Sequence, residues 1–143
     1  MNGSCLCGDV RYELKLDHIN MYQCHCEQCR KQTGTASSCG SVVRDEVFVW
    51  LSGEGNIGVW EKDSGFTSHF CRSCGSSVPN KFRGYPYYWI PVGTLDSANV
   101  VTVANLYSCE KARWSNVVSG VNSYETKPSI KSLVKLLVDT DSE

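Results

Sequence analysis

The cysteines of this chain are grouped in a way that restricts both its fold and its chemistry. Seven of the nine cysteines fall into three short clusters. The clusters read Cys5-Leu6-Cys7, Cys24-His25-Cys26-Glu27-Gln28-Cys29 and Cys71-Arg72-Ser73-Cys74. Thiolates one or two residues apart can reach the same tetrahedral ion, and Zn2+ binds cysteine sulfur at about 2.3 Å. The spacing therefore predicts that the clustered cysteines are metal ligands, with zinc as the expected ion.

Disulfide bonds are the alternative use of so many cysteines. Nine cysteines cannot all pair within one chain, and a disulfide framework requires an oxidising compartment. The first residues, Met1 to Cys5, contain neither the basic region nor the apolar run of a signal peptide. We therefore expect a cytoplasmic protein with reduced thiols, in which metal binding is favoured over disulfides. Cys39 and Cys109 lie outside the clusters and are interpreted as small, buried or half-buried residues.

Length and composition are those of one ordinary globular domain. The chain has 143 residues, of which 41% are hydrophobic and 20% are charged, and we expect a single domain over residues 1–143. The formal net charge is −1. The longest basic run is Arg30-Lys31, whereas proteins that bind nucleic acid usually carry a basic stripe. No stretch approaches the roughly 18 apolar residues of a membrane span. We therefore expect neither a nucleic acid nor a membrane as a partner.

Most of the chain has the pattern of short β-strands separated by turns. Residues 10–16 alternate apolar and polar side chains, and several β-branched or aromatic runs are bounded by glycine or serine. The expected strands are residues 10–16, 20–23, 47–51, 57–61, 66–70, 87–90 and 100–107. The pattern predicts a mainly β fold made of several small, twisted antiparallel sheets. The strand tryptophans Trp50, Trp60 and Trp89 are expected in the core; the alternative is a ligand-pocket wall formed by Trp60 or by Tyr85–Trp89.

Two segments carry helix signals. Glu27 to Gln32 is expected to form a short helix that Gly34 ends. Near the C-terminus, Ser129 is a candidate N-cap for apolar residues at positions 130, 133, 134 and 137, which is the spacing of one helix face. We expect this helix, residues 129–138, to pack on the domain.

The first and third cysteine clusters lie beside expected strands. Cys5 and Cys7 precede the first strand, and Cys71 and Cys74 follow a later one. Two such pairs can come together to close one four-cysteine site that joins the sheets. A four-thiolate zinc site has no open position and is structural. Gly8 and Gly75 each follow one of these pairs, and a glycine there lets the backbone turn tightly enough for amides to approach the sulfurs.

The middle cluster supplies three thiolates, from Cys24, Cys26 and Cys29. Three protein ligands with an open position are typical of a zinc site that performs chemistry. The candidates for the fourth ligand are His25, His69, Cys39 and water. Water or substrate is favoured, because His25 lies between two ligands and on an extended strand would point away from them. His25 is expected to be a neighbour of the site, and His69 an ordinary core or surface residue.

The middle cluster leaves two functional hypotheses open. An open zinc–thiolate site can bind an external thiol or polarise a carbonyl group, and three thiolates make the ion electron-rich, which favours a soft sulfur ligand. The first hypothesis is an enzyme that acts at the carbon–sulfur bond of a small thiol adduct. The second is a non-catalytic zinc module that binds or carries a thiol or a protein partner. A fourth protein ligand at this cluster would favour the second.

The cysteine clusters and the residues around them resemble the glutathione-dependent formaldehyde-activating enzyme family, to which centromere protein V is related. The resemblance covers residues 3–115 and is carried by four motifs and a tryptophan. These are Gly3-Ser-Cys-Leu-Cys-Gly-Asp-Val-Arg-Tyr-Glu13, Cys24-His-Cys-Glu-Gln-Cys-Arg30 with Gly34, Phe70-Cys-Arg-Ser-Cys-Gly-Ser76, Gly93-Thr-Leu-Asp96 and Trp114. Many members carry a histidine where this chain has Asn105.

The resemblance implies a fold, two zinc sites and an activity. The implied fold is the β-rich zinc fold shared with B-type methionine sulfoxide reductases. The resemblance assigns a structural zinc to Cys5, Cys7, Cys71 and Cys74. It assigns a second, catalytic zinc to Cys24, Cys26 and Cys29. The implied activity joins glutathione and formaldehyde into S-hydroxymethylglutathione, which is grouped with the carbon–sulfur lyases. Candidates to meet the carboxylates of glutathione are Arg30, Lys31, Lys62 and Arg72, for which a solvated surface charge is the simpler interpretation.

Overall fold

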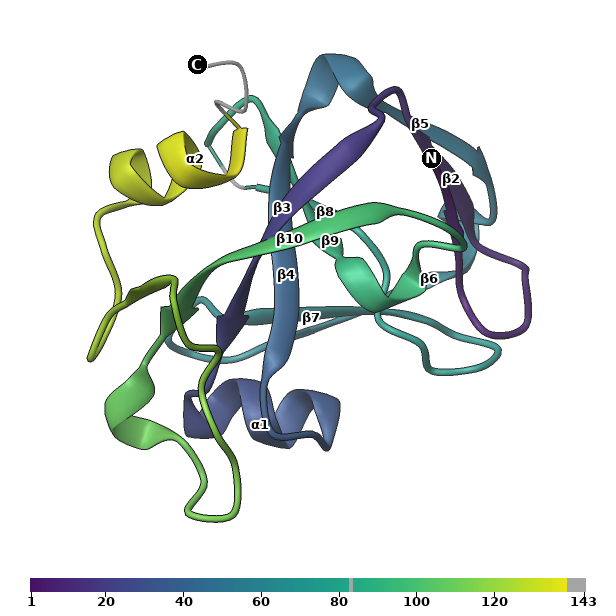
Figure 1. Cartoon of the computed structure of the whole chain (residues 1–143). Coiled ribbons are helices and arrows are strands. Elements are labelled where there is room, and N and C mark those ends of the chain that lie inside the picture. The colour runs from purple at the N-terminus through teal and green to yellow at the C-terminus, as the bar shows by residue number, and fades with distance from the viewer. Residues whose placement is uncertain (83, 139–143) are drawn as a thin grey trace. The chain divides into compact units, whose positions relative to one another are not determined.

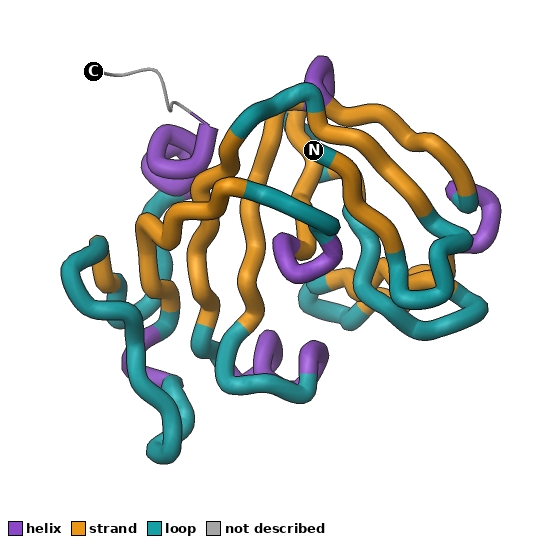
Figure 2. The backbone as a smooth tube through the Cα atoms, turned by 45° about the vertical axis from the view of Figure 1, so that its right-hand side comes forward, coloured by secondary structure: helices purple, strands orange, loops and turns teal. Residues whose placement is uncertain are grey.

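The computed structural model of the chain describes residues 1–82 and 84–138. Strands, drawn in orange in Figure 2, predominate over short helices (Figures 1 and 2). The strands are β1 Asn2–Ser4, β2 Arg11–Leu14, β3 His18–Cys24, β4 Ser38–Arg44, β5 Phe48–Ser52, β6 Ile57–Glu61, β7 Thr67–Cys71, β8 Asn80–Lys81, β9 Tyr87–Pro91, β10 Asn99–Leu106 and β11 Asn122–Ser123. The α-helices are α1 Glu27–Thr33 and α2 Ile130–Val138. Short 3-10 helices lie at Asp45–Val47, Glu54–Asn56, Val92–Thr94 and Ser108–Glu110.

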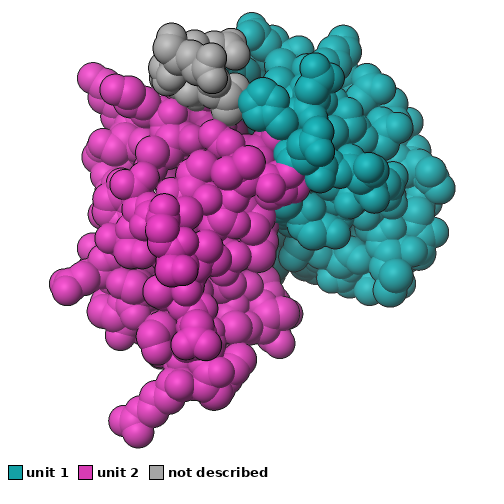
Figure 3. Space-filling model, in the orientation of Figure 1, with its two compact units in different colours: residues 1–18, 43–99 teal, residues 19–42, 100–143 magenta. Residues whose placement is uncertain are grey.

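The chain forms two compact units, coloured separately in Figure 3. The first unit contains Met1–His18 and Val43–Asn99, and the second contains Ile19–Val42 and the chain from Val100 onward. Each unit combines segments that are far apart in the sequence. Within the described residues, no helix is long and apolar enough to cross a membrane.

The first unit is built from small antiparallel sheets. Strands β1, β2 and β5 form one sheet, β6 and β7 form a two-stranded sheet, and β8 pairs with β9. Inward-facing aromatic rings fill the space beside β2 and β5. The rings of Tyr12 and Phe48 stack with centroids 5.6 Å apart, and those of Phe48 and Tyr88 stack at 4.0 Å. A second group of buried residues, Cys5, Val10, Cys71 and Val78, joins the two cysteine turns of this unit.

The second unit contains neighbouring strands in the order β11, β10, β3 and β4. Strands β3 and β4 are antiparallel, whereas β10 and β11 form a short parallel pair. The expectation of purely antiparallel pairing is therefore wrong at this one position, because the chain returns beside β10 through a long connection instead of a hairpin. Buried Cys24, Cys26, Ala104 and Leu106 form the core here, and Leu133 and Leu136 of α2 pack against it.

The expected elements agree with the structure over most of the chain. Every expected strand corresponds to an observed strand, shifted by a few residues at its ends, and both helices are present. Ser129 acts as the N-cap of α2, because its hydroxyl oxygen accepts a hydrogen bond from the Ser132 N–H at 3.2 Å. The sequence did not predict β4, which begins with the small residues Ser38, Cys39 and Gly40. Its pairing with Tyr22 to Cys24 on β3 makes this segment a strand.

Two expectations about burial are wrong. Trp60 is 56% exposed, although Trp50 packs against the core of the first unit and Trp89 is half-buried. Val59 is exposed as well, and adjacent strand residues point to opposite faces, so neither face of the β6–β7 ribbon is covered at this position. Cys109 is exposed, whereas Cys39 is half-buried as expected.

We predict that α2 stabilises the second unit mainly through Leu137, which is 3% exposed. Leu137→Ala removes a fully buried side chain and should lower the free energy of unfolding by about 2–5 kcal/mol. Ile130→Ala, on the same helix at a position that is 41% exposed, should cost about 1 kcal/mol or less. Urea denaturation followed by circular dichroism measures both. Equal losses for the two variants would show that α2 does not pack on the unit as described.

Candidate metal centres

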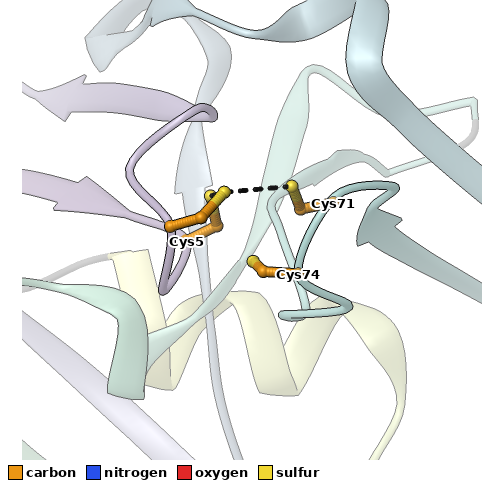
Figure 4. A group of neighbouring side chains, drawn as sticks. Cys5, Cys71 and Cys74 are labelled. Atoms are coloured by element: carbon orange, nitrogen blue, oxygen red, sulfur yellow. Dashed lines mark hydrogen bonds between the residues drawn. The ribbon is translucent and has the colours of Figure 1, made fainter.

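The first candidate centre brings together four cysteines from two turns of the first unit. The sulfurs of Cys5, Cys7, Cys71 and Cys74 all lie within 4.8 Å of one another. Cys7 Sγ is 3.6 Å from Cys5 Sγ and 3.8 Å from Cys71 Sγ, the contact drawn as a dashed line in Figure 4. Four sulfurs around a tetrahedral ion at about 2.3 Å would stand about 3.8 Å apart. The side chains therefore fit one tetrahedral metal ion.

The two turns that carry these cysteines have the same backbone design. Cys5 and Cys7 follow β1, and Cys71 ends β7. In each turn the glycine after the second cysteine has a left-handed conformation, with φ of 79° at both Gly8 and Gly75. Each glycine N–H donates to the carbonyl of the turn's first cysteine, at 3.1 Å in Gly8 and 2.8 Å in Gly75. Glycine adopts this backbone conformation without a Cβ clash, so it lets both turns aim two sulfurs at a common point.

Polar side chains connect the two turns, and the cysteine spacing does not predict these contacts. Asn56 Nδ2 donates to Asp9 Oδ2 at 2.6 Å and to Ser73 Oγ at 2.8 Å, so it connects one turn with the other. Ser76 Oγ accepts from the Leu6 N–H at 2.9 Å and lies 3.3 Å from the Cys74 sulfur. Hydrogen bonds of Asn56 and Ser76 thus help to hold the two turns, and with them the four sulfurs, in position.

The second candidate centre is formed by three cysteines of the second unit. The sulfurs of Cys24, Cys26 and Cys29 lie within 4.8 Å of one another. Cys24 is the last residue of β3, Cys26 is the N-cap of α1, and Cys29 lies in the first turn of that helix. Cys26 Sγ accepts a hydrogen bond from the Cys29 N–H at 3.2 Å. Helix α1 ends at the left-handed residue Gly34, whose N–H donates to the Arg30 carbonyl. The end of β3 and the start of α1 together bring the three sulfurs close to one another.

No fourth ligand joins this group among the described histidine, cysteine, aspartate and glutamate residues. The ring of His25 is buried and lies against Asn105, with Nε2 3.2 Å from Asn105 Oδ1. Cys39 lies on β4, and His69 lies on β7 in the first unit. None of the three protein candidates for a fourth ligand belongs to the group. The arrangement thus offers a metal ion three thiolates and no fourth ligand from the described histidine, cysteine, aspartate and glutamate side chains.

The thiols of the three-cysteine cluster differ in acidity. The hydrogen bond from the Cys29 thiol, assisted by the N–H and thiol of Cys26, lowers the pKa of Cys24 to about 6. The same hydrogen bond raises the pKa of Cys29, and burial raises the pKa of Cys26. Without a metal, the cluster at neutral pH therefore carries one thiolate, on Cys24, which its two neighbours stabilise by hydrogen bonding.

The four-cysteine cluster also divides its protons unevenly. Hydrogen bonds with Ser76 lower the pKa of the half-buried Cys74 to about 5. The Asp9 N–H acts to lower the pKa of Cys7, but the hydrogen bond with Cys5, burial and the hydrogen bonds with Cys74 and Cys71 together outweigh it and raise that pKa to about 12. Burial acts to raise the pKa of Cys5, and hydrogen bonds from the Val10 N–H and neighbouring thiols lower it overall. This cluster thus holds negative charge before any cation arrives.

Two further residues beside the three-cysteine cluster were not expected from the sequence. Glu110 Oε1 accepts from the Glu27 N–H at the start of α1, at 3.2 Å, and its negative charge acts to raise the pKa of Cys24. Tyr107 packs against the core that contains Cys24 and Cys26, and its φ of 54° is the only positive value among non-glycine residues in the described part of the chain. Neither belongs to a motif, and both follow directly after β10, whose last residue, Leu106, accepts a hydrogen bond from the His25 N–H.

The basic candidates for binding a carboxylate are in part engaged elsewhere. Arg30 Nε donates to the His25 carbonyl at 3.4 Å, and Arg30 Nη2 donates to the Glu110 carbonyl at 3.3 Å. Lys31 forms an exposed ion pair with Glu27 at 3.0 Å. Lys62 and Arg72 are exposed in the first unit. Arg30 therefore contributes to holding the cluster's backbone, and Lys31 is a solvated surface charge.

A comparison with protein-family models identifies the family of the chain. The model of the glutathione-dependent formaldehyde-activating enzyme family matches residues 1–110. The chain belongs to this family. The matched region contains all seven cysteines of the two candidate centres together with Asn105 and Glu110.

Individual relatives are more distant. A curated protein of Halomonas elongata, named "Putative glutathione-dependent formaldehyde-activating enzyme", is 29% identical over 84 residues, which are 54% of this chain and 54% of that protein. The chain thus matches about half the length of this relative. A crystal structure of a Rhodobacter sphaeroides protein superposes with a TM-score of 0.52 at 26% identity, covering 69% of this chain and 91% of that one.

The unequal acidities predict how metal binding depends on pH. Because metal ligands must be thiolates and Cys24 alone is ionised at pH 7, binding of a zinc ion to Cys24, Cys26 and Cys29 should release about two protons. Below the Cys24 pKa of about 6, about three should be released, so affinity should fall more steeply with acidification there. Calorimetric titration of the second equivalent of zinc, in buffers of different ionisation enthalpy, gives the proton count.

The matched control is Cys26→Ser, which removes one of the three sulfurs and should abolish the second binding event. Release of three protons already at pH 7 would show that Cys24 is not the acidic thiol. A pH-independent count between pH 5 and pH 8 would contradict the same assignment.

Proposed function

We propose that the protein is a zinc-dependent, carbon–sulfur lyase-like enzyme that acts on a small thiol adduct of the glutathione type. In this proposal Cys5, Cys7, Cys71 and Cys74 hold a structural zinc, and Cys24, Cys26 and Cys29 hold a second zinc at which the reaction takes place. The observation that carries the proposal is the difference between the clusters. Four sulfurs converge in one and three in the other, and a closed four-ligand site differs in chemistry from a site with an open position.

The three-cysteine cluster suits a thiol substrate. A zinc ion bound there would supply Lewis acidity and an affinity for a soft sulfur atom. Cys24 at the end of β3, Cys26 at the N-cap of α1 and Cys29 in its first turn would hold the ion. Arg30 holds the backbone at His25 and Glu110, which limits movement of the cluster. The carboxylate of Glu110 lies close enough to influence Cys24 and is the candidate to accept or return a proton.

Family membership supports the proposed substrate class. The family's description names glutathione and formaldehyde, and so does the name of the Halomonas elongata relative. In the forward direction the glutathione sulfur would form a bond to the aldehyde carbon, the carbonyl π electrons would move to oxygen, and that oxygen would take up a proton. In the reverse direction the carbon–sulfur bond breaks and the thiolate leaves. The fold likeness to B-type methionine sulfoxide reductases and the cytoplasmic location stay predictions.

We predict two zinc ions per chain that differ in their effect on folding. Cys5→Ser should lower the midpoint of thermal unfolding more than Cys26→Ser, because the four-cysteine site joins turns that are 64 residues apart at Cys7 and Cys71 and its binding energy is folding energy. Cys26→Ser should lose one zinc and keep the fold. Elemental analysis of the purified proteins gives the stoichiometry. A single zinc that persists in Cys26→Ser would contradict the second site.

We predict that glutathione perturbs one of the two centres. In the protein substituted with two cobalt ions, added glutathione should change the thiolate-to-cobalt absorption of the three-cysteine site and leave the saturated four-cysteine site unchanged. The control is Cys26→Ser, in which the change should be absent. No response to glutathione or to other small thiols would favour the alternative, a non-catalytic zinc module for a protein partner. A response without faster formation of the glutathione–formaldehyde adduct would indicate a thiol carrier.

A further inference from the structure

The residue between two cysteines of the second cluster has a buried side chain with a defined hydrogen-bonding role. His25 is 1% exposed and Asn105 on β10 is 0% exposed. His25 Nε2 lies 3.2 Å from Asn105 Oδ1. Buried polar side chains of this kind cost free energy unless they are hydrogen-bonded. The pair therefore stabilises the fold only in an arrangement that satisfies its donors and acceptors.

The hydrogen bonds of Asn105 fix the orientation of its amide. Asn105 Nδ2 donates to the Val118 carbonyl at 2.8 Å and to Ser123 Oγ at 3.0 Å. Asn105 Oδ1 accepts from the Val118 N–H at 3.2 Å as well as contacting His25. An amide side chain has two donor hydrogens and two acceptor lone pairs, and all four positions are used. Rotating the amide by 180° would place oxygen against oxygen and N–H against N–H at Val118.

The fixed amide determines which nitrogen of His25 carries the proton. Because the Asn105 oxygen can only accept, Nε2 of His25 must donate. The other ring nitrogen, Nδ1, is buried and has no hydrogen-bond partner among the described residues. A buried N–H without an acceptor at Nδ1 would cost more free energy than a buried nitrogen lone pair without a donor. Hydrogen-bond geometry thus assigns the Nε2–H tautomer.

The backbone of His25 is held as firmly as its ring. The His25 N–H donates to the Leu106 carbonyl at 2.9 Å, and the His25 carbonyl accepts from Arg30 Nε. Cys24 and Cys26 lie on either side of this residue, and neighbouring residues of an extended segment point to opposite sides. A ring anchored on one side therefore directs both flanking sulfurs to the other, where Cys29 completes the group.

We propose that His25 is a positioning residue for the three-cysteine centre, acting through the Nε2–H hydrogen bond to Asn105. Asn105 in turn attaches this bond to the returning segment at Val118 and Ser123. The inference rests on the proposed metal site and adds to it a residue that is not a ligand. Hydrogen-bonding partners outside the ligand set of a metal site contribute about 10- to 100-fold in metal affinity, and this is the size of the effect expected here.

The test compares three variants by cobalt affinity at the second site, measured by chelator competition and by thiolate-to-cobalt absorption. His25→Leu fills the same space with an apolar side chain but removes the Nε2–H donor. It should weaken cobalt binding about 10- to 100-fold. His25→Gln places an amide N–H near the position of Nε2 and should recover most of the affinity. Ser41→Ala is the matched control, since it removes another buried hydrogen bond of the same unit, to the Asn20 carbonyl. Its cobalt affinity should stay within about twofold of that of the unaltered protein, because the substitution does not touch the cysteine cluster.

Nitrogen-15 NMR of the imidazole ring provides a second, independent readout. We expect the Nε2 signal of His25 to be that of a protonated nitrogen and the Nδ1 signal that of an unprotonated one. An unprotonated Nε2, with the proton on Nδ1 instead, would overturn the proposal even if His25→Leu did not fold. Equal cobalt affinity in His25→Leu and the unaltered protein would overturn positioning alone. Absence of a second cobalt in the unaltered protein would overturn the proposed function and the positioning role with it.

Discussion

The convergence of four cysteine sulfurs at one point is the constraint that most restricts the first unit. Two turns with the same left-handed glycine bring two pairs of sulfurs to one point, and the spacing of those sulfurs is that of a tetrahedron around a single ion. Asn56 and Ser76 connect the same turns through hydrogen bonds that need no ion. The centre is thus partly assembled by the polypeptide, and a bound ion would balance the negative charge that the low pKa of Cys74 creates.

The second centre differs because its sulfurs come from one short stretch of chain. A strand end, a helix N-cap and the first helical turn supply three ligands within six residues. A stretch this short cannot easily surround an ion, and no fourth histidine, cysteine, aspartate or glutamate in the described part of the chain joins the group. The polar residues that accompany it instead orient the backbone, through Arg30, or influence charge, through Glu110. One centre therefore suits stability, and the other suits an exchangeable ligand.

The sequence predicted what depends on local pattern and missed what depends on distant chain segments. Cysteine spacing identified both groups, and the alternation of residues identified most strands. Strand β4 was missed because its small residues become a strand only through pairing with β3. Trp60 was expected in the core because it stands in a strand-like run, but a two-stranded ribbon leaves it exposed. Glu110 and Asn56 carry no motif, and Asn105 was noted only as a departure from the family pattern. What these residues contact depends on the folded arrangement.

The central claim is that the protein holds two metal ions in unequal sulfur environments. X-ray absorption at the zinc edge of the fully loaded protein measures the mean number of sulfur neighbours directly. Four sulfurs at one centre and three at the other give a mean of (4 + 3)/2 = 3.5, with the remainder made up by a light-atom ligand. Adding a small thiol should raise the mean toward four. A mean of four without added thiol, or loading by a single zinc, would contradict the account.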